Sequence, residues 1–413
     1  MSYLEKLLKG REVEWRKLGE VCDFKNGFAF KSKLFRKNGL PVIRITNING
    51  RTVDLKDVKF FEPSDYDKGN PLKFSISEGD VLIAMSGATT GKIGYYNSSE
   101  TAYLNQRVGK FKPHKEKLLD RYLYHFLLTQ SEFLYILAGG GAQPNLSSNQ
   151  LKDKLQIPIP PLHVQKEIVR ILDHFTELTA ELTAELTARK KQYAYYREQL
   201  FSFEGLEGAR EVEWKTLGDV GEVRMCKRIL KSQTSPKGDI PFYKIGTFGK
   251  QPNAFISREL FQEYKSKYNY PKIGEVLISA SGTIGRAVIF DGIDAYFQDS
   301  NIVWIENNEQ IVLNKYLFHF YKIAKWKTAE GGTIKRLYNN DLKRTKIPIP
   351  PLTEQKRIVA ILDKFDTLIN SISEGLPREI ELREQQYAYY RDFLLDFPKE
   401  NHELYERHER VVS

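Results

Sequence analysis

Two glycine-rich segments carry side chains suited to binding chemistry. Residues 139–149 read GGGAQPNLSSN, and residues 331–340 read GGTIKRLYNN. Glycines let a backbone approach a ligand closely. The amides of Gln143 and Asn145 suit the donor and acceptor pattern of adenine, whereas Lys335 and Arg336 suit guanine or a phosphate. These two segments are therefore the first candidates for contact with a nucleic acid.

Further polar side chains lie beside strand-like apolar stretches. Residues 79–96 and 274–290 share a frame in which an apolar strand, a Ser-Gly turn and a second strand follow one another. Lys92 and Arg286 lie opposite these turns. The other candidates for nucleic-acid contact are Arg44, Asn47, Gln106, Arg107, Lys244 and Gln298. For each of them, a polar side chain that simply faces solvent is the competing interpretation.

A search for catalytic motifs finds none that is complete. Residues 87–92, GATTGK, have one residue too few between the glycines for a phosphate loop, and Ile93 stands where a magnesium-binding Ser or Thr is needed. A turn between strands is the favoured interpretation. Glu263 and Lys265 resemble the end of a nuclease motif, but no aspartate is well placed beside them. The seven histidines are scattered, and we expect most at the surface. We therefore expect no catalytic residue, metal site or cofactor in this chain.

Composition favours a polyanionic partner. The 63 basic residues outnumber the 53 acidic ones, for a net charge of +10, which favours nucleic acid first and an anionic membrane second. No apolar run approaches the ~20 residues of a membrane helix. The two cysteines form no CxxC pair, so a zinc site or disulfide framework is not expected, and a reducing cytoplasm fits.

The chain is an internal tandem repeat. Three sequence anchors occur twice in the same order, whereas the segments between the anchors differ widely between the two copies. The anchors are REVEWRKLGEV and REVEWKTLGDV (11–21 and 210–220), IPIPPLHVQKEIVRILDHF and IPIPPLTEQKRIVAILDKF (157–175 and 347–365), and QYAYYR (192–197 and 386–391). A scaffold that is kept while its inserts vary indicates two unlike recognition surfaces on one framework.

A long helix is predicted after each proline-rich block. From His163 to Phe201 apolar residues recur at steps of three and four, as in a coiled coil, over about 39 residues or roughly 58 Å. The TAEL units at residues 179–186 are interpreted as a spacer that sets the helix length, although an ordinary amphipathic helix explains the helicity. In the second copy, Gly375 and Pro377 should kink or break the helix.

The predicted fold class is α+β. It has two α/β target recognition domains separated by two long antiparallel coiled-coil helices, related by a pseudo-twofold axis, with both termini near the first domain. The predicted segments are an N-terminal piece (1–9), the first domain (10–161), a central helix (162–203), the second domain (209–351), a C-terminal helix (352–397) and a tail (398–413).

This layout resembles the specificity subunit of type I restriction-modification systems, in the TAEL-containing class represented by EcoR124-type enzymes. The resemblance rests on the paired anchors and the TAEL units and covers nearly the whole chain. It implies that each domain reads one half of a split, asymmetric double-stranded DNA target in the cytoplasm, while the helices act as a ruler. It also implies two modification subunits that bring S-adenosylmethionine and methylate adenine, and restriction subunits that bring ATP and Mg²⁺.

The helices carry more tyrosine than one antiparallel pair should bury. Tyr193, Tyr196, Tyr387 and Tyr390 are therefore candidates for docking the modification subunits, with simple core packing as the alternative. Two other functions stay open. One is a self-contained DNA-modifying enzyme, against which the missing NPPY or DPPY motif counts. The other is a tandem adaptor that binds two proteins, and salt-dependent DNA binding would separate it from the DNA-reading interpretation.

Overall fold

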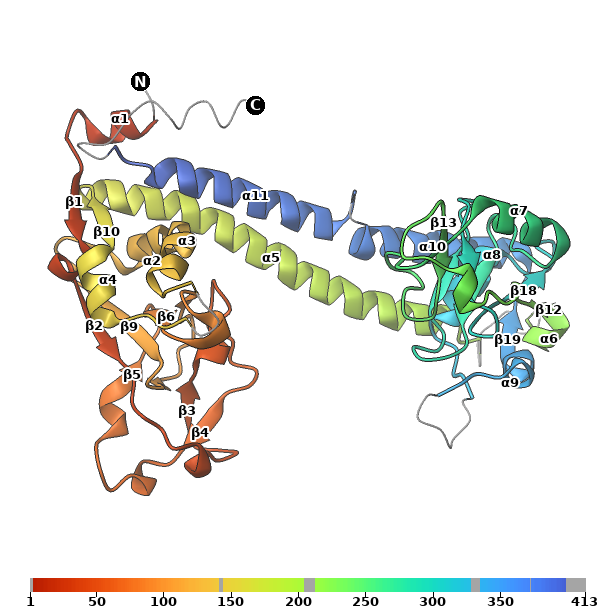
Figure 1. The fold of residues 1–413 in the computed structure, drawn as a ribbon, viewed down its shortest axis with the longest axis horizontal. Helices are drawn as coiled ribbons and strands as arrows, with labels where there is room; N and C mark the ends of the chain where they lie inside the picture. Colours follow the sequence, from red (N-terminus) through yellow and green to blue (C-terminus); the bar gives the residue numbers. More distant parts are fainter. Residues whose placement is uncertain (1–2, 141–143, 204–211, 328–334, 372, 399–413) are drawn as a thin grey trace. The chain divides into compact units, whose positions relative to one another are not determined.

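The computed structural model describes residues 3–140, 144–203, 212–327, 335–371 and 373–398, and it divides into two compact units. The first unit comprises Met1–Glu181 and Ile380–Ser413, and the second comprises Leu182–Glu379. Each contains one α/β domain and helical segments from both copies of the repeat (Figure 1). Helix α5 (Leu162–Leu200) begins in the first unit and ends in the second.

The first unit contains three small sheets. One pairs β1 with β10, the next has the order β2-β9-β6-β7, and the third has the order β4-β3-β8-β5, in which only β3 and β8 are parallel. Helices α1 (Tyr3–Leu8), α2 (Asp120–Thr129), α3 (Ser131–Leu137) and α4 (Ser148–Lys154) complete the domain. The strands are β1 (Glu14–Lys17), β2 (Cys22–Asn26), β3 (Leu40–Ile43), β4 (Lys59–Phe61), β5 (Ser75–Ile76), β6 (Val81–Ala84), β7 (Ile93–Tyr95), β8 (Ala102–Leu104), β9 (Val108–Pro113) and β10 (Gln156–Ile159).

The second unit repeats this arrangement, with one strand fewer among its described residues. Its sheets have the orders β11-β19, β12-β18-β15-β16 and β14-β13-β17, and β13 and β17 are again parallel. Its domain helices are α6 (Leu217–Val220), α7 (Arg258–Lys267), α8 (Asn314–Tyr321) and α9 (Asn339–Arg344). The strands are β11 (Glu213–Thr216), β12 (Gly221–Arg224), β13 (Ile240–Tyr243), β14 (Phe255–Ile256), β15 (Val276–Ser279), β16 (Ala287–Ile289), β17 (Tyr296–Phe297), β18 (Ile302–Asn307) and β19 (Lys346–Ile349). The predicted duplication and the α+β fold are confirmed.

The central strand of each domain separates two cores. In β6, Val81 and Ile83 contribute to the core that includes α2 and α5, while Leu82 and Ala84 contribute to the core over the other sheet. This alternation follows from the two-residue period of a strand. All four residues of β6 are buried, which explains why the sequence reads as a continuous apolar run.

A buried glutamine joins each domain to its long helix. The Gln165 side chain accepts from the Leu119 N–H (3.0 Å) and donates to the carbonyls of Lys117 (2.7 Å) and Pro160 (2.9 Å). Gln355 makes the corresponding three bonds in the second unit. Both glutamines are fully buried, so every bond replaces one that water would otherwise make. This clamp gives the glutamine of the IPIPPL anchor a structural role.

The second long helix is interrupted where the sequence predicts a break. Helix α10 (Leu352–Asn370) ends at Asn370, and α11 (Leu376–Leu395) begins six residues later with Pro377 in its first turn. A Cβ added to Gly375 would lie 2.5 Å from the Thr367 carbonyl oxygen, so only glycine allows the chain to fold back this closely. None of the described helices is long and apolar enough to cross a membrane.

Each unit contains helical segments from both repeats. In the first, α11 lies antiparallel to the beginning of α5, and Tyr390 stacks on Phe175 at 5.1 Å (Figure 1). In the second, Tyr193 and Tyr196 near the end of α5 stack on Phe365 of α10 at 5.9 and 5.8 Å. The helix of one repeat therefore completes the core of the domain that belongs to the other.

A histidine, an aspartate and a tyrosine close each of these cores. In the first unit, His125 of α2 contacts Asp173 through Nε2 (2.8 Å) and the Tyr387 hydroxyl through Nδ1 (2.9 Å). We call this set, and its counterpart in the second unit, the clasp. The expectation that most histidines lie at the surface is wrong for His125, which is fully buried. Apolar helix packing and two polar partners make that burial possible.

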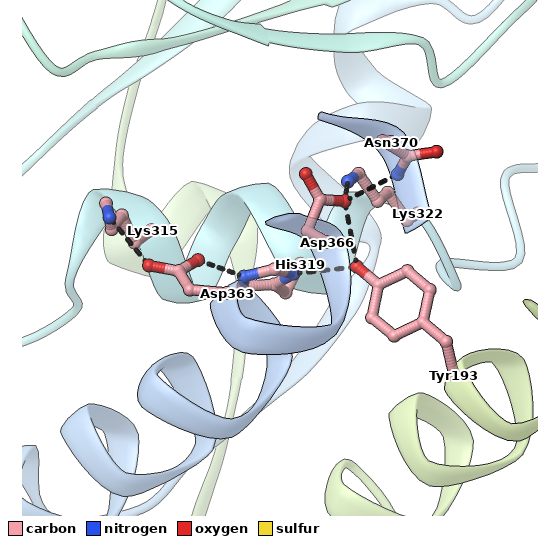
Figure 2. Close-up of polar contacts among 7 residues, drawn as sticks. All are labelled: Tyr193, Lys315, His319, Lys322, Asp363, Asp366 and Asn370. Carbon is pink, nitrogen blue, oxygen red and sulfur yellow. Dashed lines mark hydrogen bonds and ion pairs between the residues drawn. The ribbon is translucent and has the colours of Figure 1, made fainter. Parts of the chain in front are cut away.

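The second clasp consists of His319, Asp363 and Tyr193, and Figure 2 shows how they converge from α8, α10 and α5. His319 is also fully buried, contrary to the expectation for the histidines. Its Nε2 lies 2.8 Å from Asp363, but its Nδ1 lies 3.4 Å from the Tyr193 hydroxyl, which also lies 3.3 Å from Asp366. The second clasp is therefore looser than the first.

Both described ends of the chain belong to the first unit, as predicted. The Tyr3 hydroxyl donates to Glu167 at 2.8 Å, and the Trp15 indole N–H donates to the Pro398 carbonyl at 3.0 Å. Pro158 in β10 lies opposite Trp15 in β1. Within the described part of the chain β10 pairs with β1 alone, and an edge strand of this kind tolerates a proline.

Candidate nucleic-acid interface

In each unit, four segments meet around the Ser-Gly turn, and we call this region the recognition edge. The segments are the end of β3 or β13, the turn after β6 or β15, the turn before β9 or β18, and the chain that leaves the glycine-rich loop. The Met85 N–H donates to the Arg107 carbonyl (2.8 Å), and the Ala280 N–H donates to that of Asn301 (2.7 Å). Arg107 and Asn301 therefore hold equivalent positions.

The turn serines establish a second pair of equivalent positions. Ser86 forms an antiparallel bridge with Asn145 in the first unit, and Ser281 forms one with Arg336 in the second. Both serines are buried, with 4% and 6% of their surface exposed, whereas Asn145 and Arg336 are exposed. Each glycine-rich loop therefore leads directly into a residue held against the Ser-Gly turn.

Two further pairs follow from the same backbone register. Ala84 and Ser279 donate to the carbonyls of Lys92 (3.0 Å) and Arg286 (2.9 Å), which makes that pair equivalent. Arg44 and Lys244 match as the first residues after β3 and β13. The basic candidates of the two repeats therefore occupy equivalent backbone positions in their respective units.

Arg44 and Asn47 have a structural role in the first recognition edge. The buried Asn47 amide accepts from the Arg44 N–H (3.0 Å) and donates to the carbonyls of Asp54 (2.9 Å) and Asp57 (3.2 Å). Because its donors and acceptor are used inside the loop, the Asn47 amide is not available to contact a base, contrary to the prediction. The Arg44 guanidinium lies 3.8 Å from the Asp57 carboxylate, and this carboxylate partly offsets the positive charge that Arg44 contributes to the recognition edge.

The other candidates of the first unit are more accessible. Gln106, Arg107, Lys92 and Asn145 are all exposed. The Arg107 guanidinium donates to the Ser86 hydroxyl at 3.1 Å. Gln143 lies outside the described residues. The accessible set therefore combines two cations with two amides, the groups that contact phosphates and base edges.

In the second unit, three predicted residues line one cleft. Lys244, Gln298 and Arg336 border a volume of about 390 Å³. Sequence reasoning missed Arg228 and Lys231, which line the same cleft from the loop after β12. Four basic side chains against the single carboxylate of Asp299 make this cleft attractive to an anion. Their separation in sequence hid the cluster.

Two predicted residues of the second unit, Gln298 and Arg286, use polar groups of their side chains within the fold, whereas Lys335 is exposed. The side-chain oxygen Oε1 of Gln298 accepts from the Ile245 N–H at 3.0 Å, so its amide is partly committed to the fold. The Arg286 guanidinium donates to the Phe248 carbonyl at 2.8 Å and supports the loop after β13. Lys335 is exposed next to Arg336.

A second basic cluster lies along β9 in the first unit. Lys25 is directly opposite Lys110 in the β2–β9 pair. Partial burial, followed by repulsion from Lys112, Lys110 and Lys73, lowers the pKa of Lys25. Asp80 forms an ion pair with Lys110 at 2.5 Å. The sequence signal was an alternation of lysines in β9, which an exposed strand face also explains.

The buried clasps have the residue types of a general base, but no substrate can reach them. Desolvation is the main cause that lowers the pKa of His125, despite the nearby carboxylate of Asp173. The ring is fully buried, and both of its nitrogens have partners. General base catalysis requires contact with a substrate proton, so this geometry supports cohesion of the unit.

The tyrosines proposed for docking divide into two classes. Tyr193 and Tyr387 are each only 4% exposed, so burial in the clasps overturns their assignment as docking residues. Tyr196 and Tyr390 are about two-fifths exposed, with 41% and 40% of their surface accessible, and they also stack on phenylalanines. The most exposed tyrosines of the two QYAYYR segments are instead Tyr195 and Tyr389, at 59% and 66%.

Comparison with known proteins finds a matching family model. The type I restriction modification DNA specificity domain matches residues 10–189 and again residues 210–382. A Haemophilus influenzae protein, named as a candidate specificity subunit of a type I restriction enzyme, is 53% identical over 96% of this chain and 98% of its own length. The EcoR124I/EcoR124II specificity subunit of Escherichia coli is 36% identical over 97% of this chain and 98% of its own length.

Two solved structures share the fold. A chain from a study of assembly and conformational transition in the type I restriction-modification system has a TM-score of 0.61 and 16% identity, and the match covers 93% of this chain and 97% of that one. The specificity subunit of a type I system from M. genitalium has a TM-score of 0.52 and 18% identity, covering 97% of this chain and 100% of that one.

Proposed function

The chain belongs to the family of type I restriction-modification DNA specificity subunits, and from this premise we propose that it reads a bipartite, asymmetric double-stranded DNA target. Each unit binds one half of the target through its recognition edge. The two halves differ because the side chains at equivalent edge positions differ. The chain itself is the non-catalytic recognition subunit, and it acts in the cytoplasm.

One observation carries this proposal. Both recognition edges have the same backbone register, yet the position of Arg107 in the first unit holds Asn301 in the second, and that of Asn145 holds Arg336. A constant frame with variable polar side chains is what two unlike DNA sequences require, because phosphate contacts position a protein while base contacts select the sequence. The excess of basic residues supplies the salt-dependent part of the affinity.

The long helix sets the unread gap between the half-sites. Helix α5 is continuous over 39 residues and enters both units. The TAEL units lie within it at residues 179–186, where no glycine or proline interrupts the helix. A helix that links two DNA-binding units transmits its length to the spacing of their targets.

Partner subunits supply the chemistry. Two modification subunits bring S-adenosylmethionine and methylate adenine, and restriction subunits bring ATP and Mg²⁺. The exposed aromatic rings form two docking surfaces for the modification subunits, Tyr389 and Tyr390 in the first unit and Tyr195 and Tyr196 in the second. Exposed aromatic clusters on helices are favourable for association because they bury much area at little entropic cost.

Methylation mapping tests this function. The chain is co-expressed with its modification subunit, and methylated adenines are located across a host genome. We expect one motif with two unlike halves and a fixed gap, and no methylation without the chain. Lys244→Ala should weaken DNA binding and flatten its salt dependence, whereas Lys190→Ala, an exposed change on α5, should not. An undivided motif, or methylation that does not need the chain, contradicts the proposal.

A further inference from the structure

The two recognition edges carry an arginine and an asparagine at the same pair of equivalent positions, but in the opposite order. The position before β9 holds Arg107 in the first unit and Asn301 before β18 in the second. The position bridged to the turn serine holds Asn145 in the first unit and Arg336 in the second. Each edge therefore carries one arginine and one asparagine, but on opposite segments.

Both arginines are held by the turn serine, directly or through one neighbour. In the first unit, Arg107 Nη1 donates to Ser86 Oγ at 3.1 Å. In the second unit, Ser281 Oγ donates to Asn301 Oδ1 at 2.8 Å, and Arg336 Nη2 donates to the same oxygen at 3.2 Å. The buried serine thus anchors an exposed guanidinium in each unit.

These anchors leave the arginine charge available. Within the described residues, Arg107 and Arg336 donate to neutral oxygens. By contrast, Arg36, Arg121 and Arg224 are paired with carboxylates at 2.6–2.8 Å. A guanidinium has five N–H donors in a rigid fork, so one bond to a neutral acceptor fixes its direction and leaves donors for a ligand.

We propose that Arg107 and Arg336 each read a guanine, Arg107 in the first half-site and Arg336 in the second. The proposal rests on the DNA-reading function and assigns a base to one residue of each edge. A guanidinium contacts guanine O6 and N7 with two parallel bonds, which is the most common specific contact in the major groove.

The asparagines have unlike roles in this arrangement. Asn301 positions the arginine, because its carbonyl oxygen accepts from both Ser281 and Arg336. Asn145 is exposed and does not hold Arg107. Ser86 therefore holds the arginine in the first unit, and Asn301 holds it in the second.

The test compares methylated motifs, using the full complex with its modification subunit. Arg336→Ala should relax one guanine of the second half-site, with a loss of preference of about 5- to 150-fold at that base, and leave the first half-site unchanged. Arg107→Ala should do the same in the first half-site only. Asn301→Ala should give a weaker relaxation at the same base as Arg336→Ala.

Two further variants separate guanine reading from phosphate contact. Arg336→Lys keeps the charge but loses the two-pronged fork, so the relaxed base should remain relaxed. Lys92→Ala, at the exposed position beside the first turn, is the matched control and should weaken binding without altering the motif. Uniform weakening with an unchanged motif in both arginine variants, or full rescue by lysine, overturns the proposal. A wild-type complex without any bipartite motif would instead contradict the proposed function itself.

Discussion

The Tyr387 hydroxyl lies 2.9 Å from Nδ1 of His125, although 262 positions separate the two residues in the sequence. Tyr387 belongs to the C-terminal helix, whereas His125 belongs to the first domain. The reciprocal contact joins Tyr193 of α5 to His319 of the second domain. Each domain is thus completed by a tyrosine from the other repeat, and this reciprocity explains why both QYAYYR segments match.

Removing the Tyr387 hydroxyl should loosen the first unit. Since His125 Nε2 faces a carboxylate, its N–H donates there, and Nδ1 accepts from the tyrosine. Tyr387→Phe leaves this buried acceptor without a partner and should cost about 1–3 kcal/mol of local stability. Hydrogen exchange of α2 measures this cost directly, without assuming that the two units unfold together.

Tyr193→Phe should have a smaller effect on α8, because its contacts of 3.4 and 3.3 Å are longer. Tyr389→Phe, at a hydroxyl on the most exposed tyrosine of α11, is the control and should change neither helix. Equal protection of α2 in wild type and Tyr387→Phe would show that the short contact contributes no stability.

Acidification should destabilise both units through the clasps. Desolvation is the main cause that lowers the pKa of His125 and of His319 in the folded chain. The unfolded chain therefore binds more protons, and the stabilisation is fully present above pH ~6.5 and lost as the pH falls below that value. Each histidine contributes a slope of at most ~1.4 kcal/mol per pH unit.

Denaturation between pH 7.5 and 5 measures this slope. His125→Gln should flatten the first unit's response, because glutamine does not titrate, while leaving that of the second unit intact. The carboxylate pKa values of Asp173 and Asp366 are also lowered, but their contribution is lost only at a lower pH, below their ordinary range. A pH response that persists unchanged in His125→Gln would assign it to other groups.

Sequence patterns predicted the elements that have strong local signals. The repeat anchors predicted the two units, and Gly375 with Pro377 predicted the break between α10 and α11. The clasps were missed, although residues 121–126 and 315–320 read RYLYHF and KYLFHF. This fourth repeated segment would have indicated that both histidines share a structural role.

Other features could not be predicted because they depend on tertiary contacts. Asn47 and Lys92 are both polar loop residues, but one is buried with its amide fully bonded and the other is exposed. The cleft of the second unit depends on one extra residue before β18. In the first unit the Val108 N–H donates to the carbonyl of Asn105, three residues earlier. In the second unit the Ile302 N–H donates to the carbonyl of Gln298, four residues earlier, and Ser300 within this turn adopts a φ of 57°. A difference of one residue in the length of a turn produces no periodic pattern in the sequence from which it could be predicted.

The length of α5 should control the gap in the DNA target. Inserting one further TAEL unit after Leu186 lengthens the helix by about 6 Å, between one and two base pairs. Methylation mapping should then show a longer gap and two unchanged half-sites. Deletion of residues 183–186 should shorten the gap by a similar amount. Altered half-sites with an unchanged gap would contradict the role of this helix as a ruler.

The buried glutamine clamps should be essential for attaching each domain to its helix. Gln165→Ala removes three bonds from backbone groups near the domain junction, each of which is then left unsatisfied or must admit water. We expect a loss of several kcal/mol, at ~1–3 kcal/mol for each buried group. Hydrogen exchange at Leu119 reports on the first unit, and Leu313 in the second unit serves as the internal control.

Gln165→Glu separates shape from hydrogen bonding at this clamp. The carboxylate keeps the volume of the amide but presents a negative oxygen to two carbonyl oxygens, which repel it. At acid pH the protonated acid donates one hydrogen bond again, so the loss of stability relative to wild type at the same pH should become smaller. If Gln165→Glu is as stable as wild type at neutral pH, the three bonds are not what holds the junction together.

Docking of the modification subunits should depend on the outward-facing tyrosines. Tyr195 and Tyr389 occupy equivalent positions in the two QYAYYR segments and are 59% and 66% exposed. If they are central to the interface, replacing one aromatic ring with serine should weaken docking by about tenfold or more. Because the two sites are equivalent, Tyr195→Ser should weaken the docking of one modification subunit and Tyr389→Ser that of the other. Sedimentation of the complexes at concentrations between the original and the weakened Kd should then show mainly a species with one modification subunit in each single variant, and mainly the free chain in the double variant. Ile293→Ser, at a position 69% exposed in the second domain, is the control for loss of surface apolar area and should leave the assembly complete. Complete assembly of the double variant would mean that the docking surface lies elsewhere on the helices.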